Sequence, residues 1–92
     1  MIKLWVDDLR EPPYGWEWSK TSTDALFALM INDVDEISLD HDLGADDTTR
    51  PIVLWMAEHE RWPNSVRVHT ANPVGREWLV GMVERYGPGV TR

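Results

Sequence analysis

The chain has 92 residues and no cysteine, so we expect one small domain over residues 1–92, without a disulfide framework or a cysteine-based zinc site. Sixteen acidic and nine basic residues give a formal net charge of −7, which argues against a protein that coats nucleic acid through a basic face. No apolar run is long enough to span a membrane, and the acidic pair at 7–8 comes too early for a signal peptide, so we expect a cytoplasmic protein.

The first elements in chain order are two strands separated by a loop. Residues 2–6 are apolar except for Lys3, as in a strand that is buried on both faces. Residues 9–15 contain two prolines and a glycine, which exclude regular structure. Residues 16–20 alternate aromatic and polar side chains, a pattern typical of an edge strand.

A helix and a central strand follow. Residues 21–24 offer several N-cap side chains, and the apolar residues of 25–31 are spaced for one helical face. The β-prone run 37–39 then leads into the titratable sequence Asp-His-Asp at 40–42. In an open α/β sheet, ligands bind beyond the carboxyl ends of the strands, which is where these three side chains are expected.

The remaining sequence predicts a helix, a strand and a final helix. The polar loop 45–49 can cap a helix with Pro51 in its first turn, and this helix ends before Pro63. Residues 65–70 are β-branched and short, which predicts a strand. The final helix, 73–86, begins after an asparagine N-cap and carries Val74, Trp78, Met82 and Tyr86 on one stripe.

The order of these elements, β-β-α-β-α-β-α, predicts an α/β fold built as a small three-layer sandwich. The sheet is expected to have four strands and to be mostly parallel. Right-handed crossovers make the strand order 2-1-3-4 the natural arrangement.

Polar side chains follow three strands that are predicted to be neighbours. Parallel strands bring their carboxyl ends to one edge of the sheet, where several carboxylates would repel one another unless a cation held them. Oxygen ligands suit Mg²⁺ or Mn²⁺. The sequence therefore predicts a metal site there, although each acidic pair alone is also an ordinary turn sequence. The side chains concerned are Asp7, Asp8, Asp40, His41, Asp42, His69 and Thr70.

Two histidines at this edge are candidates for proton transfer. His41 lies between two aspartates, and His69 directly follows the last strand. Histidine titrates near neutral pH, so either residue could act as a general acid or base. The alternative for each is a structural histidine held by hydrogen bonds.

The start of the final helix has the features of an anion cradle. The free N–H groups after Asn72 favour phosphate, Gly75 allows a close approach, and Arg76 lies one turn into the helix. The alternative is an ordinary capped helix with a solvated arginine.

These motifs together resemble a known family. Asp7-Asp8, Asp40 and Thr70-Ala71 are similar to the acidic pair, the phosphoacceptor aspartate and the Thr/Ser-Ala step of response-regulator receiver domains, which have a flavodoxin-like fold. The longer segments 4–10, 37–44 and 68–76 resemble the cyclic-phosphate-processing receiver-like domains of bacteria and phages. Compared with a full receiver domain the chain is truncated, because the first helix and the last strand with its lysine are missing.

The resemblance implies a metal-dependent phosphoesterase that acts on a cyclic phosphate, or a related phosphodiester, of a nucleotide or nucleic-acid end. Mg²⁺ or Mn²⁺ would be held by Asp7, Asp8 and Asp40, with Asp42 in direct contact or one shell out. His41 or His69 would move the proton, and Asp40 could instead act as a nucleophile. The phosphate would be bound by Thr70, Asn72, Gly75 and Arg76. The alternative is a non-catalytic receiver-like module that regulates a partner protein.

Overall fold

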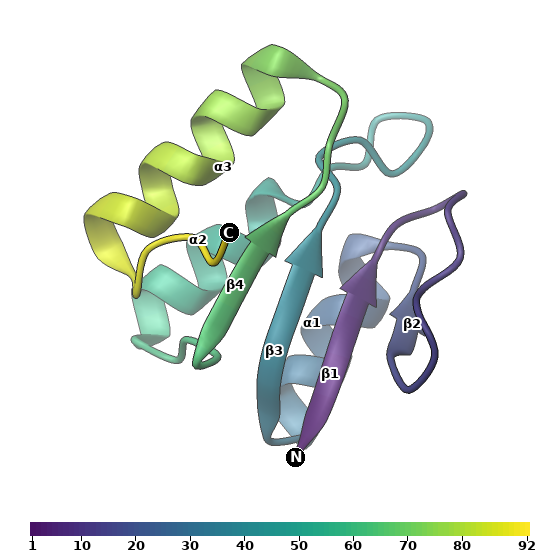
Figure 1. Ribbon diagram of the computed structural model, residues 1–92, viewed down its shortest axis with the longest axis vertical. Helices are drawn as coiled ribbons and strands as arrows, with labels where there is room; N and C mark the ends of the chain where they lie inside the picture. Colours follow the sequence, from purple (N-terminus) through teal and green to yellow (C-terminus); the bar gives the residue numbers. More distant parts are fainter.

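Four parallel strands form the sheet in the computed structural model, which describes residues 1–92. The strands are β1 (Ile2–Val6), β2 (Glu17–Ser19), β3 (Val34–Leu39) and β4 (Ser65–Val68), and their order is β2-β1-β3-β4 (Figure 1). Every pair of neighbouring strands is parallel. The predicted α/β fold and strand order are therefore confirmed.

The three helices are α1 (Ser22–Ile31), α2 (Arg50–His59) and α3 (Pro73–Tyr86). Each helix begins near the N-cap residue that the sequence offers: Thr21, Thr49 and Asn72 respectively. None of them combines the length and apolar character needed to cross a membrane.

One face of the sheet carries the hydrophobic core. In the strand register Leu4 is paired with Ile37, and Ile37 with Val66, so these side chains share a face. All three helices contribute to the same buried cluster. Their buried apolar residues are Ala25 and Leu29 from α1, Ile52, Val53 and Met56 from α2, and Leu79 and Val83 from α3.

The opposite face of the sheet has no helical layer. Trp5, Ser38 and Arg67 are register partners on this face, and Trp16 from the loop before β2 packs edge-on against Trp5. In Figure 1 the helices α1 and α2 lie behind the sheet, and the C-terminal segment passes in front near β4. The third layer of the expected sandwich thus consists of irregular segments, because the loop of residues 9–15 replaces a helix.

Helix α3 packs on the core through a stripe of residues adjacent to the predicted apolar stripe. Gly75, Leu79 and Val83 are buried, whereas Val74 and Tyr86 are 71% and 53% exposed. The stripe of Val74, Trp78, Met82 and Tyr86 therefore lines an open groove together with Arg50 and Arg85.

Candidate metal site

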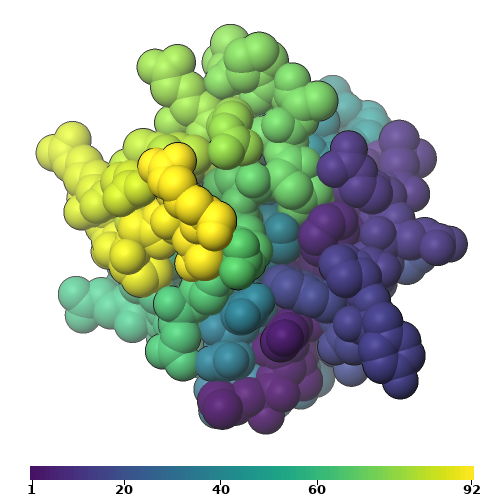
Figure 2. Space-filling model, viewed as in Figure 1, coloured from purple at the N-terminus to yellow at the C-terminus, as the bar shows by residue number.

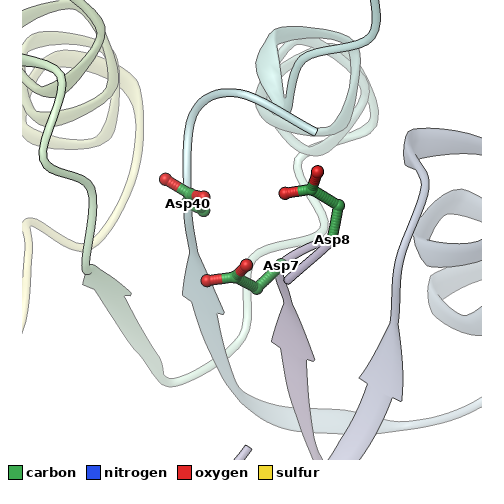
Figure 3. A group of neighbouring side chains, drawn as sticks. All are labelled: Asp7, Asp8 and Asp40. Atoms are coloured by element: carbon green, nitrogen blue, oxygen red, sulfur yellow. The ribbon is translucent and has the colours of Figure 1, made fainter. Parts of the chain in front are cut away.

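Three carboxylates gather at the carboxyl edge of the sheet. One carboxylate oxygen each from Asp7, Asp8 and Asp40 lies within 4.8 Å of the others. Figure 3 shows Asp7 and Asp8 beyond the end of β1 and Asp40 beyond the end of β3. Backbone hydrogen bonds continue the sheet ladder past the strand ends, from Asp40 N–H to Val6 O (3.0 Å) and from His69 N–H to Leu39 O (2.9 Å). The parallel topology itself therefore brings these residues together.

Asp7 is the buried member of this carboxylate cluster and the most firmly held. Its Oδ1 accepts from the N–H groups of Leu9 and Arg10 (both 2.9 Å), and its Oδ2 lies 3.0 Å from His69 Nε2. Burial pushes the pKa of Asp7 up, but these hydrogen bonds outweigh it and hold the pKa below its ordinary value. The carboxylate is therefore ionised and fixed in direction.

Asp8 and Asp40 are half-buried and keep more of their oxygen atoms free. Asp40 Oδ1 accepts from His41 N–H (2.8 Å). Gly44 has φ +87°, and a Cβ there would lie 3.1 Å from Asp8 Oδ2. The loop after β3 can thus approach the cluster closely because this position is glycine. Three clustered carboxylates with free lone pairs are a donor set that fits Mg²⁺ or Mn²⁺.

His69 connects the cluster to the helix-free face of the sheet. Its ring stacks on Trp5, with a centroid distance of 3.9 Å and an interplanar angle of 6°. The carboxylate of Asp7 can only accept, so Nε2 carries the proton, and Nδ1 accepts from the hydroxyl of Ser38 at 2.7 Å. Burial lowers the pKa of His69 against the opposing effect of Asp7. His69 is therefore a neutral imidazole at pH 7.

His41 lies buried in the loop after β3 and is only 5% exposed. Arg50 Nε–H donates to its Nε2 (2.9 Å), so the proton sits on Nδ1, which lies 3.1 Å from Asp42 Oδ1. A Cβ on Gly75 would lie 2.3 Å from the imidazole ring. Both ring nitrogens of His41 are thus engaged, and the absent side chain at Gly75 makes room for the ring.

Asp42 does not belong to the group of clustered carboxylates. Its Oδ2 accepts from Asn72 Nδ2 (2.9 Å), which ties the loop after β3 to the start of α3. Hydrogen bonds from Asn72 and His41 lower the pKa of Asp42. The contact of Asp42 with a metal, direct or one shell out, thus stays a prediction, and in the structure its carboxylate joins the loop after β3 to the start of α3.

The predicted anion cradle is occupied by the chain itself. Asn72 Oδ1 accepts from the N–H groups of Val74 and Gly75 (both 3.1 Å), and Thr70 Oγ1 accepts from Asn72 N–H (3.2 Å). Arg76 Nη1 donates to Val68 O (3.1 Å) and lines a cavity with Ser38 and His69. The phosphate contacts of Thr70, Asn72, Gly75 and Arg76 thus stay a prediction, and Arg76 points elsewhere than expected.

Four residues that hold the site together were not singled out from the sequence. Thr49 is fully buried and donates to Asp40 O (2.6 Å), and Arg50 fixes His41 while lying over the ring of Trp78. Trp5 and Ser38 support His69. Strand alternation could have placed Trp5 and Ser38 on one face, but only the register shows that they meet His69.

The comparisons with known proteins bear on the same residues. No curated protein matches the chain, and no solved structure does either. The family model described as cyclic-phosphate processing receiver domain matches residues 2–85, which include the carboxylate cluster, both site histidines and most of α3. Since this match covers nearly the whole chain, the protein belongs to the family of cyclic-phosphate processing receiver domains.

Proposed function

We propose that the protein is a metal-dependent phosphoesterase that acts on a cyclic phosphate, or a related phosphodiester, of a nucleotide or nucleic-acid end. The convergence of Asp7, Asp8 and Asp40 supports this proposal most strongly. The carboxylates stand at the carboxyl edge of a parallel sheet, where open α/β folds bind their ligands. Membership of a cyclic-phosphate processing family is consistent with it.

Asp7, Asp8 and Asp40 would hold Mg²⁺ or Mn²⁺. A bound ion of this kind polarises a phosphoryl group and lowers the pKa of a coordinated water. Asp7 supplies a carboxylate whose direction is fixed by backbone N–H groups. Asp8 accepts no hydrogen bond and Asp40 accepts only one, so both would have oxygens available to the ion, and a ligand set of so few carboxylates is what Mg²⁺ accepts.

Of the two histidines, we assign proton transfer to His69. It is neutral, lies in contact with Asp7, and reaches the cluster without an intervening residue. The ring nitrogens of His41 contact Arg50 and Asp42, neither of which belongs to the carboxylate cluster, so we assign this ring to positioning the loop after β3. Asp40 is the residue through which a covalent route would pass, because it occupies the receiver phosphoacceptor position and only one of its oxygens has a hydrogen bond.

Thermal melts and turnover assays test the proposal. Mg²⁺ or Mn²⁺ at about 100 times its Kd should stabilise the wild type by about 2.7 kcal/mol relative to chelator. Asp40→Asn should lose both this stabilisation and the hydrolysis of ribose cyclic phosphates. Asp33→Asn is the matched control, because it removes the same charge from an exposed loop just before β3, at the other end of that strand. A wild type that neither responds to these ions nor hydrolyses any cyclic phosphate would contradict the proposal.

A second candidate is a regulatory module that acts on a partner protein. The observation in its favour is the open groove along α3, where Val74 and Tyr86 are exposed beside Trp78 and Met82. Exposed apolar stripes of this kind are frequent at protein interfaces. This candidate predicts metal binding without turnover, so the same assays separate the two functions.

A further inference from the structure

A cavity of about 370 Å³ lies behind His69, on the side away from the carboxylate cluster. It opens on the helix-free face of the sheet, between β1, β3, β4 and the C-terminal segment. In Figure 2 the yellow C-terminal residues and the green residues of the β4 region border a recess on this face. The polar side chains that line it are Ser38, Arg67, His69, Arg76, Thr91 and Arg92.

The charge of this arginine cavity is opposite to that of the whole molecule. Three of the nine basic residues line it, in a chain whose net charge is −7. Arg67 and Arg92 each approach one glutamate, Glu36 and Glu84, at 3.9 Å, which is too long for a hydrogen bond. Surface pairs of this kind contribute little to stability, so an anion could compete with either glutamate for its arginine.

The guanidinium donors of the arginine cavity are also largely unused. Arg76 donates one N–H to Val68 O, and the guanidinium groups of Arg67 and Arg92 donate no hydrogen bond. Each guanidinium has five N–H groups in a planar fork that matches the oxygens of phosphate. Like charges gathered in one cavity repel one another until an anion joins them.

The walls of the arginine cavity add room for the rest of a ligand. Trp5, Val68 and Val90 are the apolar lining residues, and the hydrogen-bonded pair of Ser38 and His69 also lines the cavity. The volume falls within the range of small-molecule sites. A charged group held by arginines beside an apolar wall suits a small organic phosphate better than a bare ion.

We propose that the arginine cavity is a binding site for the phosphate group of a small phosphorylated molecule. Arg67 and Arg76 supply the forked donors, and Arg92 adds charge at the rim. The site is separate from the carboxylate cluster and needs no metal ion. The imidazole of His69 lies between the carboxylate cluster and the arginine cavity, because its Nε2 contacts Asp7 and its Nδ1 contacts Ser38.

The test is a calorimetric titration of the protein with inorganic phosphate and with a ribose monophosphate, in chelator and at low ionic strength. The wild type should bind both saturably. Arg67→Gln and Arg76→Gln should each weaken binding about tenfold or more, which corresponds to losing one charge-assisted contact. Arg85→Gln is the matched control, because it removes one exposed arginine from the last turn of α3, outside the cavity. Its affinity should stay within about twofold of wild type.

Two further measurements distinguish a loss of phosphate binding at the arginine cavity from an effect of the metal site and from a loss of folding. Asp40→Asn should still bind phosphate in chelator, whereas a loss there would assign the binding to the carboxylate edge and overturn the proposal. Melting curves check that Arg76→Gln is folded. If it is not, the phosphate affinity of Arg67→Gln alone tests the proposal. Absence of saturable binding by the wild type, or an equal loss in Arg85→Gln, would also overturn it.

Discussion

The carboxylate cluster and the network around His41 meet at Asp40 and His41, the first residues after β3, yet they differ in how far their polar groups are satisfied. In the His41 network every ring nitrogen and both oxygens of Asp42 have a partner. In the cluster, Asp8 accepts no hydrogen bond and Asp40 accepts only one, although both carboxylates have an oxygen within 4.8 Å of Asp7. A satisfied network builds a rigid support, and an unsatisfied group of like charges is poised for a ligand. The difference separates the residues that hold the site from those available for chemistry.

Gly75→Ala should break the support most severely. The new Cβ would lie 2.3 Å from the buried ring of His41, so either the ring or the start of α3 must move. Overpacking typically costs about 1 to 3 kcal/mol, and a contact this close puts Gly75→Ala at the upper end. Denaturant unfolding measures it. Gly81→Ala, at an exposed position of the same helix with nothing within 4 Å, is the control and should gain up to about 1 kcal/mol from helix propensity. Equal stability of the two variants would refute the packing role of Gly75.

Arg50→Met should weaken the same support by about 1 to 3 kcal/mol, because it leaves His41 Nε2 buried without its donor. The variant also loses the contact of the guanidinium with Trp78. Thermal and denaturant unfolding report the loss. Arg85→Met provides the comparison, since Arg85 packs only over the ring of its neighbour Tyr86. If both variants lose the same stability, the hydrogen bond to His41 contributes nothing.

Asp40→Asn should act in the opposite direction and stabilise the protein in chelator. Carboxylates about 4 Å apart repel by about 4 kcal/mol at an effective dielectric of 20, and solvent screening reduces this to about 1 kcal/mol for half-exposed groups. The amide keeps an oxygen that can accept from His41 N–H. A rise of several degrees in melting temperature is expected without metal, and no response to Mg²⁺. A less stable variant would show that Asp40 is satisfied in the wild type and that the contrast between the two regions is not real.

The smallest expected effect is on the pH dependence of stability. Because burial lowers the pKa of folded His69, the unfolded chain binds more protons just below the ordinary value of 6.5. The free energy of unfolding should therefore fall as the pH decreases from 7 to 5 in chelator. Asp7 adds to the loss only at lower pH, since its folded pKa lies below 3.8.

His69→Gln should flatten this slope, and His59→Gln, the same substitution at an exposed helix position, serves as the matched control. Denaturant titrations at a series of pH values measure both. An unchanged slope in His69→Gln would mean that the imidazole is not held neutral by its surroundings.

The fold and the carboxylate cluster could both be predicted from the sequence, because both follow from the order of the strands. Parallel strands with right-handed crossovers send their carboxyl ends to one edge, so strand-end residues such as Asp7 and Asp40 converge whatever their side chains do. Caps at Thr21 and Asn72 likewise follow local rules.

The directions of individual side chains could not be predicted from strand order and helix caps. Arg76 stands one turn past an N-cap, and nothing in its spacing shows that it turns toward Val68. That direction depends on which face of the sheet lacks a helix, which is a tertiary property. The role of Ser38 could not be predicted either. It is a polar residue inside an apolar strand, and only the strand register shows that it lies between Trp5 and Arg67.

The hydrogen bond from Arg76 to Val68 also bears on how the outer edge of the sheet is protected from pairing with another chain. An open sheet has two edges whose free backbone groups can recruit another chain. Here β2 exposes only three residues, and β4 is shielded by the Val66–Val90 bridge and the bond from Thr91 N–H to Val66 O. Arg76 covers the next carbonyl along that edge with a charge. One arginine thus blocks edge-to-edge pairing at the point where the strand would otherwise be open to it.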